Sequence, residues 1–353
     1  YDLVRFFEKL PSTLPDNLKI PDIYFVIHRN AIIFDHNSNK IHFVTHLLKD
    51  EVSDLKKLVD TVNTGPELRL DTKIDYTKVE SNTSKEKFIE IVEKAREYIR
   101  IGDIFQVVLS RRVDVTTKRD PIAIYFDLRK INPSPYMFYL DYGDFQVLGA
   151  SPEIQVRVEN DKIEMRPIAG TRGRGSTDKE ELSIERELLG DDKERAEHTM
   201  LVDLCRNDLG RISEFGSVKE PELFIVERYS HVQHIVSHVV GKLKKGFDSF
   251  DVFRATFPAG TVSGAPKVRA MEIIEELEKE SRGTYAGIVG YFDLKGSMDT
   301  CITIRSILVK DGKASVQAGA GIVLDSNPNN EWIETKRKAN ACIKAITGKE
   351  LDL

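Results

Sequence analysis

The sequence predicts an α+β fold, because its expected strands come in consecutive runs and the helices lie between those runs. Four short apolar segments follow one another between residues 136 and 167, and three more between residues 284 and 324. Strict alternation of strands and helices would instead have predicted a doubly wound parallel sheet. The chain has 353 residues, of which 41% are hydrophobic, so it can bury a sizeable core in one large domain or two smaller ones.

The first 80 residues are expected to form a short, irregular, β-rich region. Its expected elements are strands at Ile20–Asn30, Ala31–Asp35 and Ile41–Val44 and a helix at Val52–Asn63. The segment from 64 to 81 is polar and aperiodic, so we expect the domain boundary there. The chain is thereby divided into an N-terminal region, residues 1–80, and a main domain, residues 81–353.

The main domain is expected to begin with a helix that a capping box at Thr83–Glu86 opens and Gly102 ends. Further helices are expected at Ile122–Lys130, Leu182–Leu189, Glu194–Leu209, Phe250–Thr256, Lys267–Lys279 and from a cap at Ser326–Pro328 to Ile346. Strands are expected at Ile104–Val113, Tyr136–Asp141, Phe145–Ala150, Ile154–Val158, Ile163–Pro167, Leu223–Val226, His231–Gly241, Thr284–Asp293, Thr300–Lys310 and Ala314–Leu324. The glycine-rich segments Pro167–Ser176 and Phe257–Pro266 are expected to be loops.

Charge and cysteine content exclude several classes of protein. The net charge is −5 with both signs mixed along the chain, and no basic face is evident, so nucleic acid is not an expected partner. Cys205, Cys301 and Cys342 are odd in number and far apart, which suits a reducing cytoplasm. No apolar run approaches the roughly 20 residues of a membrane helix. The chain starts at Tyr1 rather than Met, which is typical of a fragment.

The helix expected at Glu194–Leu209 carries two acids on its apolar face. Glu194 and Glu197 continue the stripe that Leu201 and Leu204 should bury. Two ionised carboxylates beside apolar packing repel each other and lose hydration unless a cation joins them. A divalent metal with oxygen ligands, such as Mg²⁺, would account for the pattern. The alternative is an ordinary helix whose first turn is acidic, which the helix dipole favours.

The last expected helix repeats this arrangement. Glu331, Glu334 and Lys338 share one side of it, and small apolar residues follow. Glu334 and Lys338 could form an exposed ion pair worth about 0.3–0.5 kcal/mol. Alternatively, one carboxylate from each helix holds a single Mg²⁺, which binds an anionic substrate.

Common catalytic and nucleotide-binding motifs are absent from the sequence. No phosphate loop of the G-x-x-x-x-G-K-[ST] type occurs, and Gly319-Ala-Gly321 lacks the third glycine of a dinucleotide fingerprint. Neither a G-x-S-x-G elbow nor an H-E-x-x-H zinc motif is present. The glycine-rich loops therefore indicate either tight turns or close approach to a small ligand.

Several motifs together resemble those of the chorismate-utilising enzymes, and are most similar to those of the large, synthase subunits of anthranilate synthases. The motifs are Phe105–Arg111, Asn132–Phe138, Pro167–Thr171, Ala196–His198, Leu201–Leu204, Phe257–Lys267, Ala318–Ile322 and Glu331–Thr335. The resemblance implies large antiparallel sheets packed together with helices outside. It implies a magnesium-dependent lyase of tryptophan biosynthesis that converts chorismate and ammonia to anthranilate and pyruvate. A separate glutamine amidotransferase subunit, component II, would supply the ammonia.

The resemblance also implies roles for individual residues. Glu197 and Glu334 would bind Mg²⁺, with Glu194 and Glu331 beside them, and Glu153 would be the acid that helps the ring hydroxyl leave. His198 would support the loss of pyruvate. The implied substrate contacts are Gly170, Thr171, His234, Thr261, Tyr285, Arg305, Gly319, Ala320, Gly321 and Lys338. A raised pKa of Glu153 is expected, because only a protonated carboxyl can donate to a poor leaving group.

Two positions distinguish between relatives of this family. Gln106 stands where relatives that add water carry a lysine base, and ammonia needs no such base. Ala169 stands where the relatives of folate synthesis carry a nucleophilic lysine. Both favour anthranilate as the product. The alternatives are an aminodeoxychorismate synthase and a non-catalytic regulator that binds chorismate or tryptophan.

A feedback site for tryptophan is implied only in part. Asn132–Phe138 resembles one half of the family's site, with Pro135, Tyr136 and Met137 as the expected contacts. The other half lies in an N-terminal portion that this chain is expected to lack. Feedback inhibition is therefore an open expectation for this sequence.

Overall fold

A computed structural model describes residues 1–47, 53–65, 70–228 and 232–353. For Thr171 it describes the backbone only. It divides the chain into two compact units, residues Ile23–Asp71 and residues Tyr1–Asp22 with Thr72–Leu353. The divisions between the two units therefore fall after Asp22 and after Asp71, whereas the sequence predicts a single boundary near residue 80. Residues 1–22 belong to the large unit, where the α-amino group of Tyr1 donates to the carbonyl of Gly283 at 2.8 Å.

The described residues of the small unit form an antiparallel hairpin and a helix. Strand β1 (Asn30–Asp35) pairs with β2 (Lys40–Thr45), and α1 spans Leu55–Thr64. The strand expected at Ile20–Asn30 is wrong: only Asn30 joins a strand, because the preceding described residues pair with no neighbouring strand. The expected start of the helix, Val52, lies outside the described residues.

The large unit contains two seven-stranded sheets whose pairings are all antiparallel, which confirms the α+β fold. In the first sheet the strand order is β12-β4-β16-β15-β6-β5, and β3 pairs with β4. Its strands are β3 (Tyr76–Ser81), β4 (Gln106–Thr117), β5 (Tyr136–Asp141), β6 (Phe145–Ser151), β12 (Gly264–Ala265), β15 (Ser306–Lys310) and β16 (Lys313–Ile322). In β16, Gly319 lies opposite Ser110 and Gly321 opposite Val108.

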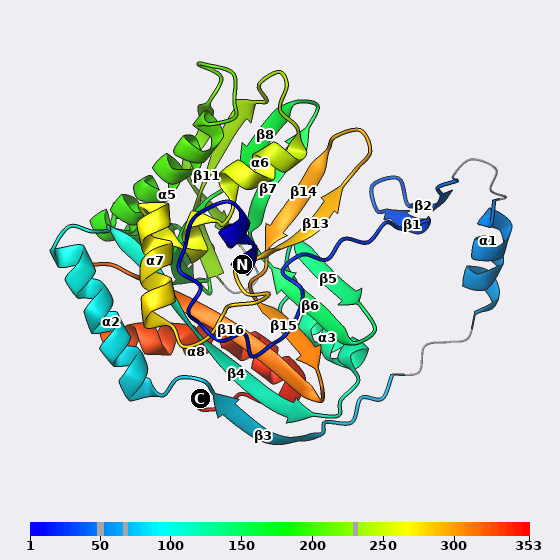
Figure 1. Cartoon of the computed structure of the whole chain (residues 1–353), viewed down its shortest axis with the longest axis horizontal. Coiled ribbons are helices and arrows are strands. Elements are labelled where there is room, and N and C mark those ends of the chain that lie inside the picture. The colour runs from blue at the N-terminus through cyan, green and yellow to red at the C-terminus, as the bar shows by residue number, and fades with distance from the viewer. Residues whose placement is uncertain (48–52, 66–69, 229–231) are drawn as a thin grey trace. The chain divides into compact units, whose positions relative to one another are not determined.

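The helices that pack against this sheet are α2 (Lys85–Arg100), α3 (Pro121–Ile131), α7 (Lys267–Leu277) and α8 (Pro328–Thr347). Figure 1 shows α8 behind β16. Apolar side chains of α3 and α8, such as Ile124 and Ile343, are buried against strand residues such as Val113 and Ile307. This packing holds α8, with its acidic first turns, against the strands of the sheet.

The second sheet has the order β10-β11-β8-β7-β14-β13, and β9 pairs with β11. Its strands are β7 (Ile154–Glu159), β8 (Lys162–Met165), β9 (Ile168–Gly173), β10 (Lys219–Arg228), β11 (Val232–Lys242), β13 (Ile288–Phe292) and β14 (Met298–Ile302). The remaining helices of this unit are α4 (Asp178–Gly190), α5 (Asp192–Gly210) and α6 (Ser249–Thr256), with a 3₁₀ turn, η2, at Gly260–Val262. Helix α5 packs on β9 and β11 (Figure 1).

Four local expectations are corrected by the structure. The N-cap of α2 is Ser84, whose hydroxyl accepts from the Lys87 amide, and not Thr83. The polar segment before residue 81 contains β3, because Tyr76–Ser81 pairs with β4. The glycine loop expected at 167–176 contains β9, which pairs with β11.

The fourth correction concerns the long strand expected at Thr300–Lys310. It is divided into β14 and β15, which belong to different sheets. Arg305 lies between them with a left-handed φ of 49°, which departs from the extended conformation of a regular strand. No helix among the described residues is long and apolar enough to cross a membrane.

Candidate active site

Acids in the first two turns of α5 and α8 lie within electrostatic reach of each other. Asp191 caps α5 and Asn327 caps α8 through their side chains. Burial raises the pKa of Glu197, and the negative charges of Glu194 and Glu334 raise it further. Two segments that are about 140 residues apart in sequence thus contribute carboxylates to one region.

Each of these acids has a defined polar partner. The side-chain amide of Gln106 donates to Glu197 Oε1 at 3.0 Å. Arg172 Nη1 lies 2.9 Å from Glu194 Oε1, an ion pair that the sequence analysis did not identify. Glu334 pairs with Lys338 at 2.6 Å, and Lys338 Nζ also donates to the carbonyl of Gly319 at 3.2 Å.

Glu331 lies deeper than Glu334. Its residue is 9% exposed, and burial raises the pKa of its carboxyl; a hydrogen bond from Ser326 opposes this rise, and the charge of Glu334 adds to it. The side chain of Glu334, by contrast, is 43% exposed. Glu334 is therefore the acid of α8 that is free to reach a ligand from solvent.

The donor set fits a cation that needs few protein ligands. Among the described residues no three His, Cys, Asp or Glu side chains are arranged to hold a metal. Glu197 and Glu334 would thus provide two carboxylates at most, which suits Mg²⁺ because it keeps waters and substrate oxygens as its other ligands. The raised pKa of Glu197 is an electrostatic cost that a bound cation would relieve.

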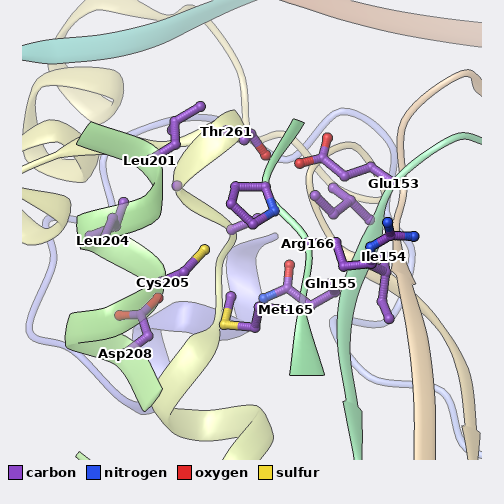
Figure 2. A pocket seen from close by; sticks show the side chains of 14 residues that line it. Glu153, Ile154, Gln155, Met165, Arg166, Leu201, Leu204, Cys205, Asp208 and Thr261 are labelled. Carbon is purple, nitrogen blue, oxygen red and sulfur yellow. The ribbon is translucent and has the colours of Figure 1, made fainter. Parts of the chain in front are cut away.

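Glu153 is a buried acid directly before β7. Its residue is 8% exposed, and burial raises the pKa of its carboxyl to about 7, although Thr261, Arg305 and Lys338 oppose the rise. In Figure 2 the hydroxyl of Thr261 points toward this carboxyl across a small cavity. The cavity is also lined by Cys205 and Asp208 of α5. Glu153 is therefore partly protonated near neutral pH, as its predicted role requires.

Glycines allow close approach of other groups to the backbone around these acids. A Cβ at Gly321 would lie 2.5 Å from Gln106 Nε2, and one at Gly319 would lie 2.7 Å from the hydroxyl of Tyr285. Gly170 has a φ of +64°, and its carbonyl lies 2.9 Å from His234 Nδ1. Burial raises the pKa of Tyr285 to about 12, so its hydroxyl stays a proton donor.

The remaining predicted substrate contacts are placed less completely. Arg305 is half-buried, and its charge acts on Glu153, His234 and Tyr285. Ala320 is fully buried in the apolar cluster beneath α2 and α8. The side chain of Thr171 lies outside the described part of the chain.

His198 is a core residue. Its side chain is fully buried, its Nε2 lies 2.6 Å from the hydroxyl of Ser237, and its ring packs against Phe224. Burial lowers the pKa of His198 to about 4, so the imidazole is neutral at physiological pH. Its role in pyruvate loss stays a prediction.

The segment predicted to bind an effector lies at the start of β5. The hydroxyl of Tyr136 donates to Asp299 Oδ1 at 2.9 Å, and Arg157 contacts both residues. Pro135 and Met137 are its neighbours in sequence, exposed or half-buried. The tryptophan site stays a prediction.

A wide groove reaches Glu197 from the surface. Its volume is about 1250 Å³. Helices α5 and α7 and the segment before β4 contribute most of its walls, including Ala196, Met200, Asp203, Lys267, Val268 and Phe105. The groove is large enough to admit a small molecule to Glu197.

Comparison with known proteins places the chain in one group. The profile of a family described as "chorismate binding enzyme" matches residues 1–344. Anthranilate synthase component 1 of Aquifex aeolicus is 51% identical over 98% of this chain and 72% of its own length, and that of Acetivibrio thermocellus is 49% identical over 98% and 73%. The crystal structure of anthranilate synthase component I from Streptococcus pneumoniae has a TM-score of 0.89 and 41% identity over 97% of this chain and 78% of its own.

A solved structure with another activity is less similar. The menaquinone-specific isochorismate synthase of Escherichia coli has a TM-score of 0.74 and 26% identity, over 83% of this chain and 68% of its own. Its sheets therefore share the architecture, while the sequence likeness is much greater to the component 1 proteins.

Proposed function

Because the chain belongs to the family of chorismate-binding enzymes, we propose that it converts chorismate and ammonia to anthranilate and pyruvate. The observation that carries this proposal is the 45–51% identity to several component 1 proteins of anthranilate synthase over 98% of the chain or more. Gln106 supports it, because a neutral amide bonded to Glu197 supplies no base for activating water. Ammonia is a nucleophile without such help.

The substrate is a dianion, so two separate sites should hold its carboxylates. Arg305 and the hydroxyl of Tyr285 would bind the enolpyruvyl carboxylate, with the backbone of Gly319 and Gly321 beside it. These glycines are needed there because a Cβ at either would overlap a neighbouring polar group. Lys338, bonded to the carbonyl of Gly319, would add positive charge to the same side.

Glu153 would donate the proton that releases the ring hydroxyl as water. Hydroxide is a poor leaving group, and a carboxyl whose pKa is about 7 can both hold a proton and deliver it near neutral pH. The proton that the added ammonia gives up balances this donation, so Glu153 can return to its protonated form. Thr261 would orient the carboxyl, since its hydroxyl points toward it (Figure 2).

We propose Mg²⁺ as the cofactor, bound by Glu197 and Glu334 with Glu194 and Glu331 nearby. When bound, it would hold the second carboxylate of chorismate and withdraw electrons from the ring. The protein's own contribution is to bring two carboxylates together and to keep Glu197 in place through Gln106. Arg172 would hold the Glu194 carboxylate in place through its ion pair.

A second protein component would supply the ammonia. The relatives are named component 1, which names one part of a larger enzyme. We propose that the partner is a glutamine amidotransferase, and that the enzyme serves tryptophan synthesis. Tryptophan binding at Pro135–Met137 would then provide feedback.

A glutamine-free assay tests the reaction. Chorismate, ammonium and Mg²⁺ are mixed with the protein, and anthranilate is followed by its fluorescence. We expect a signal that depends on all three components. A folded sample that gives amino-chorismate without fluorescence would instead indicate an aminodeoxychorismate synthase. Calorimetric binding of chorismate without turnover at any Mg²⁺ concentration would indicate a regulator.

A further inference from the structure

We propose that Arg282 is a positioning residue of the chorismate site, acting through the segments that carry Gln106, Thr261 and Tyr285. The inference rests on the proposed function, because it assumes that these three residues face the substrate. Arg282 itself lies in the loop between α7 and β13 and is 1% exposed. Nothing in the sequence pattern singled it out.

A buried ion pair anchors the guanidinium. Arg282 Nε donates to Glu278 Oε2 at 2.9 Å, and Nη2 donates to Glu278 Oε1 at 2.6 Å. The two side chains are 1% and 3% exposed. A buried charge pair of this kind is retained only where its geometry and its remaining hydrogen bonds are well satisfied. Glu278 and Arg282, with the groups they bind, are called the Arg282 clamp below.

The clamp joins two segments that carry predicted site residues. Arg282 Nη1 donates to the carbonyl of Val262 at 2.7 Å, and Nη2 donates to the carbonyl of Val108 at 2.7 Å. Val262 follows Thr261 directly in η2, and Val108 lies two residues after Gln106 in β4. The guanidinium therefore fixes the distance between the turn that orients Glu153 and the strand that holds Glu197.

The clamp also contacts β16 and the segment that carries Tyr285. The Glu278 carboxylate accepts from the amide and hydroxyl of Ser110 at 2.8 Å each, and that hydroxyl accepts from Gln317 of β16 at 2.9 Å. The guanidinium lies 5.5 Å from the ring centroid of Tyr285. Tyr285 is thereby held with its hydroxyl next to Gly319.

Arg282 has little capacity left to bind substrate. Four hydrogen bonds use four of the five donors of its guanidinium, and its charge is paired with Glu278. A lysine would preserve the charge but could not bind two carbonyls and a carboxylate in one plane. The expected consequence of that change is a displaced Thr261, Gln106 or Tyr285 rather than a lost substrate contact.

The test compares R282K with R119K as a matched control. Arg119 is also buried, donates to the carbonyls of Ala345 and Ile346, and pairs with Asp127, but it holds the end of α8 against α3. Both variants should lose thermal stability. At a temperature where both are folded, R282K should lose on the order of tenfold or more in kcat/KM for chorismate and bind chorismate more weakly by calorimetry. R119K should stay within about threefold of wild type.

A double-mutant cycle with Y285F separates positioning from general destabilisation. If Arg282 acts through Tyr285, the combined loss in kcat/KM is smaller than the product of the single losses. Losses that multiply would exclude Tyr285 as the residue through which Arg282 acts. Equal losses in R282K and R119K, or an R282K enzyme that matches wild type, would overturn the proposal. Chorismate binding by R282K, R119K and wild type can be compared by calorimetry even if the wild type shows no turnover. A wild type that does not bind chorismate would refute the proposed function itself.

Discussion

Replacing Glu153 with glutamine tests whether burial sets the protonation of this acid. Glutamine has the same shape and cannot ionise. Burial raises the pKa of Glu153 from 4.5 to about 7 despite the nearby charges of Arg305 and Lys338. At about 1.4 kcal/mol for each tenfold change, that displacement makes the ionised carboxylate cost roughly 3 kcal/mol in the folded state.

The sign of the pH dependence follows from linkage. Because the folded pKa lies above the unfolded value, the native state binds more protons than the unfolded state between pH 4.5 and about 7. The free energy of unfolding of the wild type therefore falls as pH rises through this window. Below pH 4.5 Glu153 does not lower the free energy of unfolding. Above about pH 7 the ionised carboxylate lowers it by the full amount of roughly 3 kcal/mol.

E153Q should therefore be less active and, at high pH, more stable. We expect kcat to fall on the order of 10²–10⁴-fold, the usual contribution of a general acid. Urea unfolding at pH 5 and pH 8 should show a stability difference between E153Q and wild type that grows in favour of E153Q. Glu159, an exposed acid at the far end of β7, supplies the control E159Q. A difference that does not change with pH would refute the reasoning.

The other predictions concern the carboxylates and the glycines around them. E334Q should abolish anthranilate formation with little change in melting temperature, because the side chain is 43% exposed and its ion pair with Lys338 is worth about 1 kcal/mol or less; normal turnover with a large drop in melting temperature would contradict this. Q106K should reduce the rate of ammonia-dependent anthranilate fluorescence on the order of tenfold or more, because the lysine ammonium group would form an ion pair with Glu197 in place of the hydrogen bond from the Gln106 amide. Unchanged rates over an ammonium titration would contradict this role of Gln106. G321A should lower activity similarly with a small effect on stability, because its Cβ would displace the flexible end of Gln106, 2.5 Å away; wild-type turnover would show that this approach is not needed.

Regular elements with strong periodicity could be predicted from the sequence. Helix α5 was expected at Glu194–Leu209 and spans Asp192–Gly210, and the last helix was expected to end at Ile346 and ends at Thr347. Strands β5 and β6 were also expected within one residue of their bounds. In each case local signals of hydrophobic spacing and capping agree with the final packing.

Elements that depend on distant partners could not be predicted. The segment Ile168–Gly173 contains two glycines and forms a strand only because β11 lies beside it. Ile20–Asn30 has the composition of a strand and lacks a pairing partner among the described residues. Strand formation requires a neighbour that the local sequence does not specify.

The sequence by itself determined which chemical groups are present: two helices with acidic first turns, a glutamine where a base would stand, and glycines where backbone must be approached. These are properties of residue type and short-range spacing, and the comparison with known proteins agrees with the family that they indicate. Only the tertiary structure decided which groups interact and how strongly. The raised pKa of Glu153, the mutual influence of Glu197 and Glu334, and the Arg282 clamp all depend on burial and on neighbours that are distant along the chain. Desolvation and hydrogen-bond geometry arise only once the chain has folded, so no local pattern can encode them.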